Sequence, residues 1–471
     1  MNKKRPSTLT VACILAFISY PLQAILAAVF LLLGSADTSL FVVTLLFVIM
    51  AVAITAWIGI WKMKLWGAIL FTALALFIQL PALILGYVNF LGFFLSLIYI
   101  AIIWFGYYTD IDAHIVPVLV PILAVVTAVI IGGIVIALVG GNPFQAYIGL
   151  IQGSFGNAKA LSETAVWATP YIFAGLAVAV AFKGGLFNIG AEGQLALGAV
   201  VSALIGYALP GWLGFDLPAI IHIPLAIGLG ALAGALWAAV PGFLKAYTGG
   251  HEVINTIMMN YIALNLTSFL LNGPMKDSSP TNVSARTPVI AASARIGPLI
   301  EGFRVHWGFV LALIVAVLIW ALLQKTTLGF EIRMVGSNPD AAKYAGINVK
   351  RTIVLTMALS GLLAGLAGAI EVTALNYRHE LGFSQGYGFD AIAIALLGKT
   401  NPFGVVIAAI LFGAMRNGAT RMQFLTMIPV DVISIIQALI LLFVAADAII
   451  RYIYRIRSSG ERVVLTRGWG G

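Results

Sequence analysis

The sequence predicts an all-α, polytopic transmembrane helical bundle, and composition and segment length together support that fold class. Hydrophobic residues make up 61% of the 471 residues and charged residues only 9%, and the mean hydropathy is +1.05. A soluble domain carries about 25% charged residues. Apolar segments recur along the chain, and each approaches the roughly 20 residues that one helical span requires. We therefore expect a multi-pass membrane protein.

The basic residues indicate orientation in the membrane rather than a nucleic-acid partner. The formal net charge is +9, and most of the cations lie in short loops and near the two ends of the chain. Lysine and arginine accumulate on the cytoplasmic side of membrane proteins. The basic residues within 1–5 and in the tail 456–471 therefore predict that both termini are cytoplasmic. The single cysteine, Cys13, excludes an internal disulfide.

The first 110 residues are predicted to form an additional four-span N-terminal membrane segment. Its apolar stretches lie at 10–33, 40–60, 66–87 and 90–108. Almost no ionisable residue lies inside them, so we expect no binding site there. A role in helical packing or assembly is the simplest interpretation.

The following part, 111–455, is predicted to be the functional core, with ten further segments. They lie at 116–140, 166–182, 193–209, 217–242, 249–272, 305–324, 351–377, 386–398, 402–416 and 430–450. We expect 141–165 to be a polar external loop and 272–304 to be a long external loop. The basic stretch 328–351 is expected in the cytoplasm. Fourteen segments in all agree with two cytoplasmic termini.

The stretch Phe182–Gln194 interrupts this pattern most sharply. It contains four glycines and the charged residues Lys183 and Glu192 between two apolar segments. Glycine is a poor helix former, and a charge at membrane depth costs about 2.5–3.5 kcal/mol on insertion scales. Irregular polar backbone is tolerated there only where protein or a water-filled cavity surrounds it. The stretch is therefore either a cytoplasmic hairpin or a broken helix that lines a pathway.

Three features mark the last block of segments. The small residues of Gly361–Gly368 predict a face for close helix packing. Glu371 lies deep in its span and is a functional candidate because an intramembrane carboxylate is costly. The segment that begins at Gly386–Asp390 is too short to span comfortably, which suggests a broken or re-entrant element.

A short helix is predicted outside the membrane, after Ser337. Ser337-Asn338-Pro339-Asp340 is typical of a helix start, with a polar cap residue, a proline early in the first turn and an acid next to it. Gly346 is expected to end this helix. Such an element between two spans suits docking to a soluble partner.

Several kinds of chemistry are excluded. Gly398-Lys399-Thr400 ends like a phosphate-binding loop, but that loop needs a glycine where this chain has Ala393. The sequence contains no His-Glu-x-x-His motif, no cysteine pair and no Gly-x-Ser-x-Gly motif. We therefore expect neither ATP binding by this chain nor a cofactor, a metal site or enzymatic activity.

At four stretches the sequence resembles permease subunits of the simple-sugar/nucleoside family of ABC importers, in the branched-chain amino acid/ribose-type superfamily. These stretches are Phe182–Gln194, Gly249–Tyr261, Gly329–Asn348 and Gly386–Pro402, and the resemblance covers roughly 115–455. It implies a type II importer fold in the cell membrane. It also implies cytoplasmic ATPase subunits that bind ATP, a second related permease and an extracellular substrate-binding lipoprotein as partners.

The resemblance also implies roles for individual residues. The coupling helix that meets the ATPase would comprise Gly336, Ser337, Asn338, Pro339, Asp340, Ala341, Ala342, Tyr344, Ala345 and Gly346. The residues that would line or shape the substrate path are Phe187, Asn188, Glu192, Gln194, Asn255, Asn260 and Asp390, to which the intramembrane position of Glu371 adds that carboxylate.

We therefore expect the permease of an ATP-driven nucleoside importer. A neutral nucleoside requires amide and carboxylate partners and aromatic surface. A simple-sugar permease of the ribose or galactoside type is the nearest alternative. In an ion-coupled secondary transporter, Glu192 and Glu371 would act as proton relays. A membrane-embedded enzyme is disfavoured because no nucleophile lies beside a base.

Overall fold

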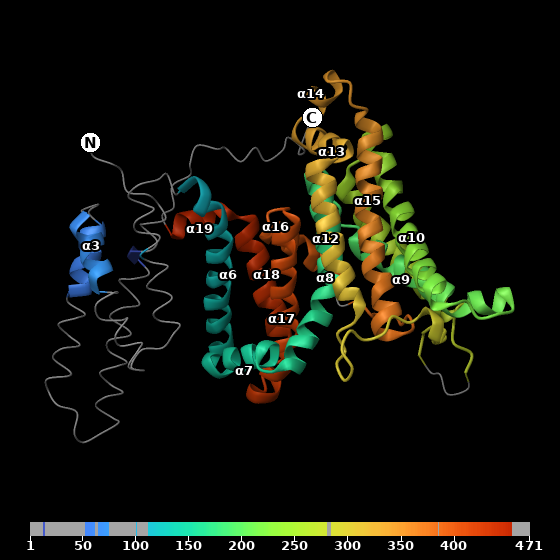
Figure 1. Cartoon of the computed structure of the whole chain (residues 1–471), viewed down its shortest axis with the longest axis horizontal. Helices are drawn as coiled ribbons and strands as arrows, with labels where there is room; N and C mark the ends of the chain where they lie inside the picture. The colour runs from blue at the N-terminus through green and yellow to red at the C-terminus, as the bar shows by residue number, and fades with distance from the viewer. Residues whose placement is uncertain are drawn as a thin grey trace. The chain divides into compact units, whose positions relative to one another are not determined.

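The computed structural model describes residues 13–14, 52–61, 65–74, 100, 112–279, 284–384 and 386–454. The chain forms two compact units (Figure 1). One comprises residues 1–126 and 446–463, and the other comprises residues 127–445 and 464–471.

The first unit contains a pair of short helices. The helix Val52–Trp61 and α3 (Leu65–Leu74) pack together through the rings of Trp57 and Phe71, whose centroids are 4.8 Å apart. The short helix α19 (Asp447–Ile453) belongs to the same unit.

Some predictions for the chain ends fall outside the described residues. The spans at 10–33 and 90–108 and the basic termini lie almost wholly there. The domain boundary at residue 110 and the cytoplasmic placement of the termini therefore stay predictions.

The second unit is built from helices in the part of the chain that the structure describes, with two isolated bridges and no strand. Its elements are α6 (Asp112–Leu138, shared with the first unit), α7 (Pro143–Phe155), α8 (Ala158–Lys183), α9 (Ala191–Leu213), α10 (Ala219–Thr248), α11 (Glu252–Asn272), η2 (Ala292–Ala294), α12 (Trp307–Lys325), α13 (Thr327–Ser337), α14 (Pro339–Tyr344), α15 (Val349–Ile370), the π-helix η3 (Glu371–Asn376), α16 (Tyr387–Leu397), α17 (Pro402–Thr426) and α18 (Asp431–Ala445).

These helices confirm the all-α, polytopic fold. Among the described residues, eight helices are long and apolar enough to cross a membrane, and nine if α18 and α19 form one span. They follow the predicted order, and α16 is short, as expected for a re-entrant element. The protein is therefore a multi-pass membrane protein.

The polar loop predicted at 141–165 is wrong. α7 occupies most of it, and α8 begins at Ala158 rather than at 166. The Asn142 side chain caps α7 by accepting from the Phe144 backbone N–H, and the Asn157 side chain caps α8. The same polar residues that suggested a loop are the helix caps. α17 likewise extends to Thr426, beyond its predicted end at 416.

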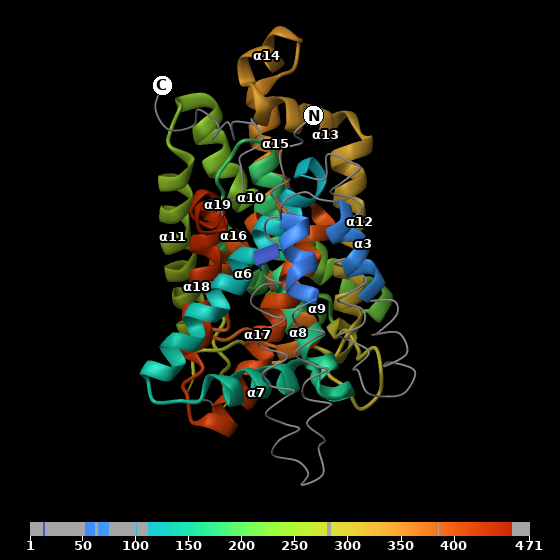
Figure 2. The ribbon, with the colours of Figure 1, turned by 90° about the vertical axis from the view of Figure 1, so that its left-hand side faces the viewer.

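The second unit has two distinct ends, which Figures 1 and 2 show. The α14 end carries α13, α14 and the start of α15. The loop end carries residues 273–279, residues 284–306 and the turn after η3. α8 runs from the loop end, where Ser162 accepts a hydrogen bond from the Val305 N–H, to the α14 end, where Lys183 meets Gly336. α15 runs in the opposite direction.

Two halves of this unit repeat one series of elements with opposite direction. In each, a surface helix (α7, or α13 with α14) precedes a long helix (α8 or α15), a break, a helix that begins at depth (α9 or α16) and two more helices. The breaks also share a pattern: Phe187 and Gly190 precede α9 as Phe383 and Gly386 precede α16. Inverted repeats of this kind with paired broken helices are typical of transporters.

Glycines allow the central helices to meet backbone to backbone. A Cβ added at Gly361 of α15 would overlap the Gly234 carbonyl oxygen of α10, and one at Gly368 would overlap the Leu195 carbonyl oxygen of α9. A Cβ at Gly365 would lie 2.8 Å from the Gly230 carbonyl oxygen. The predicted small-residue packing face is therefore confirmed.

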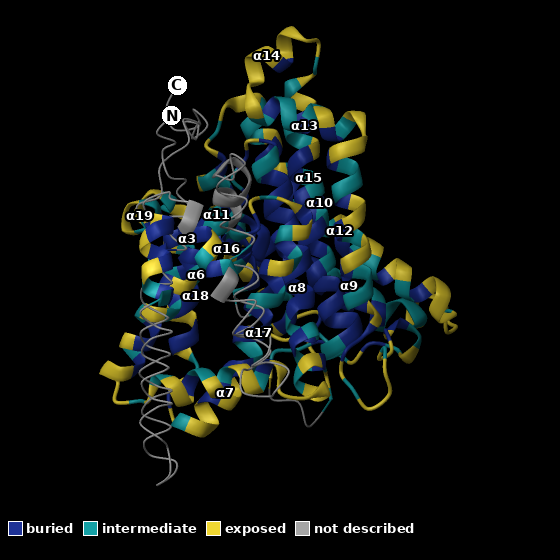
Figure 3. Ribbon diagram, turned by 60° about the vertical axis from the view of Figure 1, so that its left-hand side comes forward, coloured by how far each residue is buried: buried dark blue, intermediate teal, exposed yellow. Residues whose placement is uncertain are grey.

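Burial separates inner helices from outer helices (Figure 3). Within the most apolar window of each helix, 83% of α8 is buried, against 22% of α11 and 28% of α12. The outer helices expose apolar side chains that suit contact with lipid. α8, which contacts both breaks, is the central column of the unit.

Candidate functional site

The first break starts where α8 ends. Gly185 has a φ of 72°, in the left-handed region that favours glycine, and residues 186–189 are not helical. This segment folds back along α8 and reaches the depth of Ala177, whose carbonyl oxygen accepts a hydrogen bond from Ser360. Of the two predicted alternatives, the structure therefore has a broken helix at depth, with Gly185 as its turn at the α14 end.

Asn188 is the centre of a closed hydrogen-bond cluster in this break. Its Nδ2 donates to Gln194 Oε1 (2.9 Å) and to Ser360 Oγ (2.8 Å). Its Oδ1 accepts from the Gly190 N–H (2.9 Å) and from Gln194 Nε2 (3.0 Å). All three side chains are buried. Because every polar atom of Asn188 is used within the protein, the cluster stabilises the irregular backbone.

Asn260 of α11 supports the start of α9 in the same way. Its Oδ1 accepts from the Gly193 N–H (2.8 Å), and its Nδ2 donates to the Ile189 carbonyl oxygen (2.8 Å). One buried amide therefore satisfies a donor and an acceptor on the two sides of the turn into the helix.

Glu192 joins the first break to the second. Its Oε2 accepts from the backbone N–H of Gly388 (2.7 Å), in the first turn of α16, and its Oε1 accepts from Ser384 Oγ. A carboxylate at a helix N-terminus stabilises the free N–H groups and the positive end of the helix dipole. Glu192 thus couples the start of α9 to the start of α16 inside the membrane.

The second break begins with the π-helix η3. The Tyr377 N–H donates to the Val372 carbonyl oxygen (2.9 Å), five residues earlier, and Tyr377 has a φ of 53°. The chain then returns into the protein, and Gly386 (φ 88°) precedes α16. A single π-turn in a helix often marks a functional site.

A cavity of about 240 Å³ opens beside this second break. Polar side chains and aromatic rings from α8, η3 and α16 line it together. The lining residues are Val166, Trp167, Arg304, Glu371, Leu375, Asn376, Arg378, Glu380, Gly382, Phe383 and Tyr387. Of the predicted path residues, Glu371 lines this cavity directly.

An aromatic column leads from the cavity toward the centre of the unit. Trp167 and Tyr387 ring centroids are 6.4 Å apart, and Tyr387 meets Tyr171 at 5.1 Å. Tyr171 Oη donates to Asp390 Oδ2 (2.8 Å). The predicted path residue Asp390 therefore lies at the inner end of the column.

Trp167 and Tyr171 of this column were not predicted, although the sequence carries a signal for them. Trp167 and Tyr171 lie four residues apart, so they share one face of α8. Their spacing alone does not distinguish a path from ordinary core packing. Tyr387 was named only as part of the short re-entrant segment.

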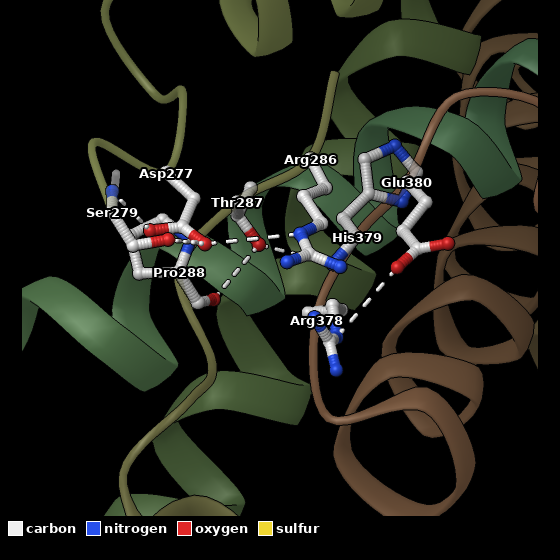
Figure 4. A network of polar contacts seen from close by, with 8 residues as sticks. All are labelled: Asp277, Ser279, Arg286, Thr287, Pro288, Arg378, His379 and Glu380. Carbon is white, nitrogen blue, oxygen red and sulfur yellow. Dashed lines mark hydrogen bonds and ion pairs between the residues drawn. The ribbon is translucent and has the colours of Figure 1, made fainter. Parts of the chain in front are cut away.

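The long loop of 273–306 is fastened to the turn after η3. The Thr287 N–H donates to the His379 carbonyl oxygen (2.9 Å), and the His379 N–H donates to Thr287 Oγ1 (3.0 Å). Figure 4 shows this pairing, with Arg286 directed toward Asp277 (3.7 Å) and Arg378 toward Glu380 (3.6 Å). The loop is therefore packed over the second break and hydrogen-bonded to it.

The pKa values of titratable groups in the loop and in the turn after η3 are shifted for different physical reasons. Hydrogen bonds from Ser279 and the charge of Arg286 hold the pKa of Asp277 below its usual value. Burial lowers the pKa of His379 to about 3 and that of His306 to about 4, the latter with a smaller contribution from Arg304. Both histidines are therefore neutral at physiological pH.

The predicted coupling residues form a protruding element (Figure 2). Asn338 Oδ1 accepts from the backbone N–H groups of Asp340 and Ala341 (both 3.0 Å), and Pro339 is the first residue of α14. Gly346 has a φ of 83°, and Tyr344 is 97% exposed. The predicted helix and its caps are confirmed, although Ser337 is the last residue of α13.

α14 is joined to the first break through α13. A Cβ added at Gly336 would overlap the Lys183 carbonyl oxygen and would lie 2.7 Å from the Gly185 nitrogen. The two backbones therefore touch directly at the α14 end.

Two predicted residues lie apart from the buried clusters. Asn255 is near the start of α11, where its Nδ2 lies beside Gly250 at the α14 end. Phe187 is half-buried and packs on Phe182, with ring centroids 4.8 Å apart. Phe187 thus lies within the first break but outside its hydrogen-bond cluster, and the structure brings the predicted path residues other than Asn255 to the two breaks.

Comparison with protein families identifies the chain. The family described as "Branched-chain amino acid transport system / permease component" matches residues 160–445. The chain belongs to this family of transport permeases. The match covers both breaks and the helices around them, so the resemblance stated from the sequence is confirmed.

The chain aligns with several curated relatives over most of the length of each relative. The guanosine ABC transporter permease protein NupP of Bacillus subtilis is 41% identical over 71% of this chain and 95% of its own. The nucleoside ABC transporter permease protein NupB of Lactococcus lactis is 36% identical, covering 71% and 92%. The glucose ABC transporter permease protein TsgB13 of Haloferax volcanii is 34% identical, covering 73% and 90%. No solved structure matches the chain.

Proposed function

We propose that this permease carries nucleosides into the cell as part of an ATP-driven importer. Two relatives similar over most of their length are permeases for guanosine and for nucleosides. The observation that carries the proposal within the structure is the cavity at the second break. It combines two carboxylates, two arginines, an amide and three aromatic rings.

The chemistry of this cavity fits a nucleoside better than a simple sugar. A nucleoside offers an aromatic base that packs on rings and neutral donors and acceptors that bind side chains. The column that continues from Trp167 through Tyr387 to Tyr171 extends this aromatic surface inward. A glucose permease is also among the relatives, so a sugar is the alternative substrate.

Energy would come from partner subunits through α14. In the proposed orientation the α14 end is cytoplasmic and the loop end is external. An ATPase that moves α14 would press α13 against Lys183–Gly185 and so act on the first break. Glu192 then connects this break to α16 beside the cavity. Rigid movement of one half against the other would alternate access.

The proposed assembly has partners on both sides. ATPase subunits would bind α14 and the residues that flank it, since residues 337–346 are exposed except Ala342. A second, related permease would complete the membrane part, and an external lipoprotein would deliver the substrate. ATP would be bound by the ATPase subunits alone, and the assembly would lie in the cell membrane.

Uptake competition tests this proposal. Cells that carry the permease with its partner genes are given radiolabelled guanosine and an excess of unlabelled nucleosides or sugars. Competition by nucleosides, with no effect of ribose, galactose or glucose, is the expected result. No uptake of guanosine, together with uptake of radiolabelled ribose, galactose or glucose by the same cells, would establish the alternative.

A second arm separates ATP coupling from ion coupling. Loss of the ATPase subunit is expected to stop uptake, and collapse of the proton gradient at maintained ATP is expected to leave it. The reverse pattern would instead support Glu192 and Glu371 as proton relays.

A further inference from the structure

The carboxylate of Glu371 differs from the other buried carboxylates of the second unit. Glu192 accepts hydrogen bonds from Gly388 and Ser384, and Glu252 pairs with Lys245 at 2.9 Å. Glu371 is only 6% exposed and has no cation within 4 Å among the described residues. Arg304, the basic residue that acts on it from a distance, is paired with Glu163 at 3.0 Å.

This leaves acceptor capacity unused on a buried group. A carboxylate has about four lone-pair sites, and burying it without hydrogen bonds costs free energy. The Asn376 amide, which faces Glu371, can satisfy one of these sites. The remaining acceptors face the cavity.

The π-helix is what brings this pair together. In an α-helix, residues five apart point about 140° away from each other because one turn takes 3.6 residues. In a π-turn, residues five apart lie approximately one above the other, and the hydrogen bond from the Tyr377 N–H to the Val372 carbonyl oxygen shows that spacing. Glu371 and Asn376 can therefore present a carboxylate and an amide to one side, where both line the cavity.

We propose that Glu371, positioned by the π-turn with Asn376, binds two adjacent neutral hydrogen-bond donors of the transported nucleoside. This inference rests on the proposed function and names the recognising group. Two parts of a nucleoside carry such a pair: the N1–H and amino group of guanine, and the 2′- and 3′-hydroxyls of ribose. The rings of Trp167, Phe383 and Tyr387 line the same cavity and supply surface for the base.

A carboxylate suits this task because its two oxygens are both acceptors. Glu371→Gln keeps the shape but replaces one acceptor by a donor. A ligand with paired donors then loses one hydrogen bond and meets an unfavourable contact. A ligand that lacks one donor of the pair loses less.

The experiment combines protein variants with substrate analogues in a double-mutant-type cycle, measured in the complete transporter. Inhibition of guanosine uptake is measured for guanosine, inosine (which lacks the amino group) and 2′,3′-dideoxyguanosine, with wild type and Glu371→Gln. The external binding protein is the same in every arm, so its own preference cancels in the cycle. Glu301→Gln, an exposed carboxylate at the loop end, is the matched control.

The expected result is that Glu371→Gln weakens inhibition by guanosine at least tenfold and reduces discrimination against one analogue at least fivefold. Reduced discrimination against inosine assigns the donors to the base, and reduced discrimination against the dideoxy analogue assigns them to the ribose. Unchanged discrimination against both analogues would overturn the inference. Glu301→Gln is expected to behave as wild type.

A second variant keeps the test decisive if Glu371→Gln fails to assemble. Asn376→Ala keeps the carboxylate but removes the amide that faces it, and it should shift discrimination against the same analogue. No shift with a properly assembled Asn376→Ala complex would then count against the inference. A wild-type complex that imports no nucleoside would instead contradict the proposed function, so the two failures are distinguishable.

Discussion

At the first break, Asn188 uses all its polar atoms in a closed cluster with Gln194, Ser360 and Gly190, whereas at the second break Glu371 faces a cavity of about 240 Å³. Both breaks interrupt a long helix, and both lead into a helix that starts at depth. The first is satisfied by its own side chains and touches α13. At the second break, polar side chains line the cavity beside aromatic rings and are available to bind a substrate.

This comparison separates framework from recognition. Polar residues inside a membrane are commonly taken as candidates for the substrate path. Here Asn188, Gln194 and Asn260 have partners that account for their presence, so we infer that they hold the break together. Glu371 has one side-chain partner, Asn376, and lines the cavity, so it is the stronger candidate for contact with the substrate.

The largest expected effect is on stability, from matched substitutions in the two breaks. Asn188→Leu leaves Gln194, Ser360 and the Gly190 N–H without a partner. Because each unsatisfied buried group costs about 1–3 kcal/mol, the loss is expected to exceed about 3 kcal/mol. Asn376→Leu, at the cavity, is expected to cost less than about 1 kcal/mol while reducing uptake. Thermal unfolding of the purified permease measures the difference, and equal losses would contradict the separation of roles.

The next largest effect tests the contact between α13 and the first break. Gly336→Val would force the Lys183 carbonyl away, so transport is expected to fall more than tenfold because α14 no longer moves the break. Gly297→Val is the control, since nothing lies within 4 Å of a Cβ there. ATP-driven uptake in reconstituted vesicles measures both. Normal uptake by Gly336→Val would remove this contact from the coupling route.

Segments 284–290 and 377–383, which cover the second break, should open more easily at acid pH. Their free energy of opening is expected to fall by about 2 kcal/mol at pH 5. His379 has a pKa of about 3 when buried and about 6.5 when exposed. Below pH 6.5 His379 takes up a proton in the opened state but not in the closed state. The free energy of opening is therefore largest above pH 6.5 and falls toward pH 3. Hydrogen exchange of 284–290 and 377–383 measures the opening.

Two variants sharpen the pH prediction. His379→Leu should reduce the pH dependence, and the remainder should come from His306, whose pKa is also lowered by burial. Arg286, Arg378 and Glu380 surround this region, but arginine keeps its charge throughout the range. The free energy of opening is obtained from exchange rates corrected for the pH dependence of intrinsic amide exchange. An opening free energy that is unchanged between pH 7.5 and 5 would contradict the role of the two histidines.

The smallest expected effect concerns α14 alone. Ala345→Arg adds a bulky cation on an exposed position, so it should reduce substrate-stimulated ATP hydrolysis about tenfold without changing the unfolding temperature. Tyr261→Ala, at a 61% exposed position on α11, is the control. Unchanged hydrolysis in the reconstituted complex would argue against ATPase docking at this helix.

Much of the fold was predictable because membrane spans depend on local composition. Ten core segments were predicted, and each has a helical counterpart. The helix start at Ser337–Asp340 and the glycine face that begins at Gly361 were also predicted, since both depend on residue type at fixed positions. α7 was missed because its N-cap Asn142 and the nearby Asn157, which caps α8, resemble loop residues.

The candidate site was predicted only in part. The composition of Phe182–Gln194 and the depth of Glu371 located both breaks. Composition does not reveal partners, however, and only the folded chain shows that Asn188 meets Ser360, 172 residues later. The π-turn that aligns Glu371 with Asn376 likewise depends on packing rather than on propensity.

The central claim is that the second break holds the substrate and the first does not. Cys13 is the single native cysteine, so Cys13→Ser gives a background for Leu375→Cys at the cavity and Phe187→Cys at the first break. The rate of labelling by a membrane-impermeant thiol reagent is measured in the complete transporter with and without saturating nucleoside. We predict that nucleoside, but not glucose, slows labelling of Leu375→Cys at least fivefold and leaves Phe187→Cys unchanged. Equal labelling of Leu375→Cys with and without nucleoside would contradict the claim.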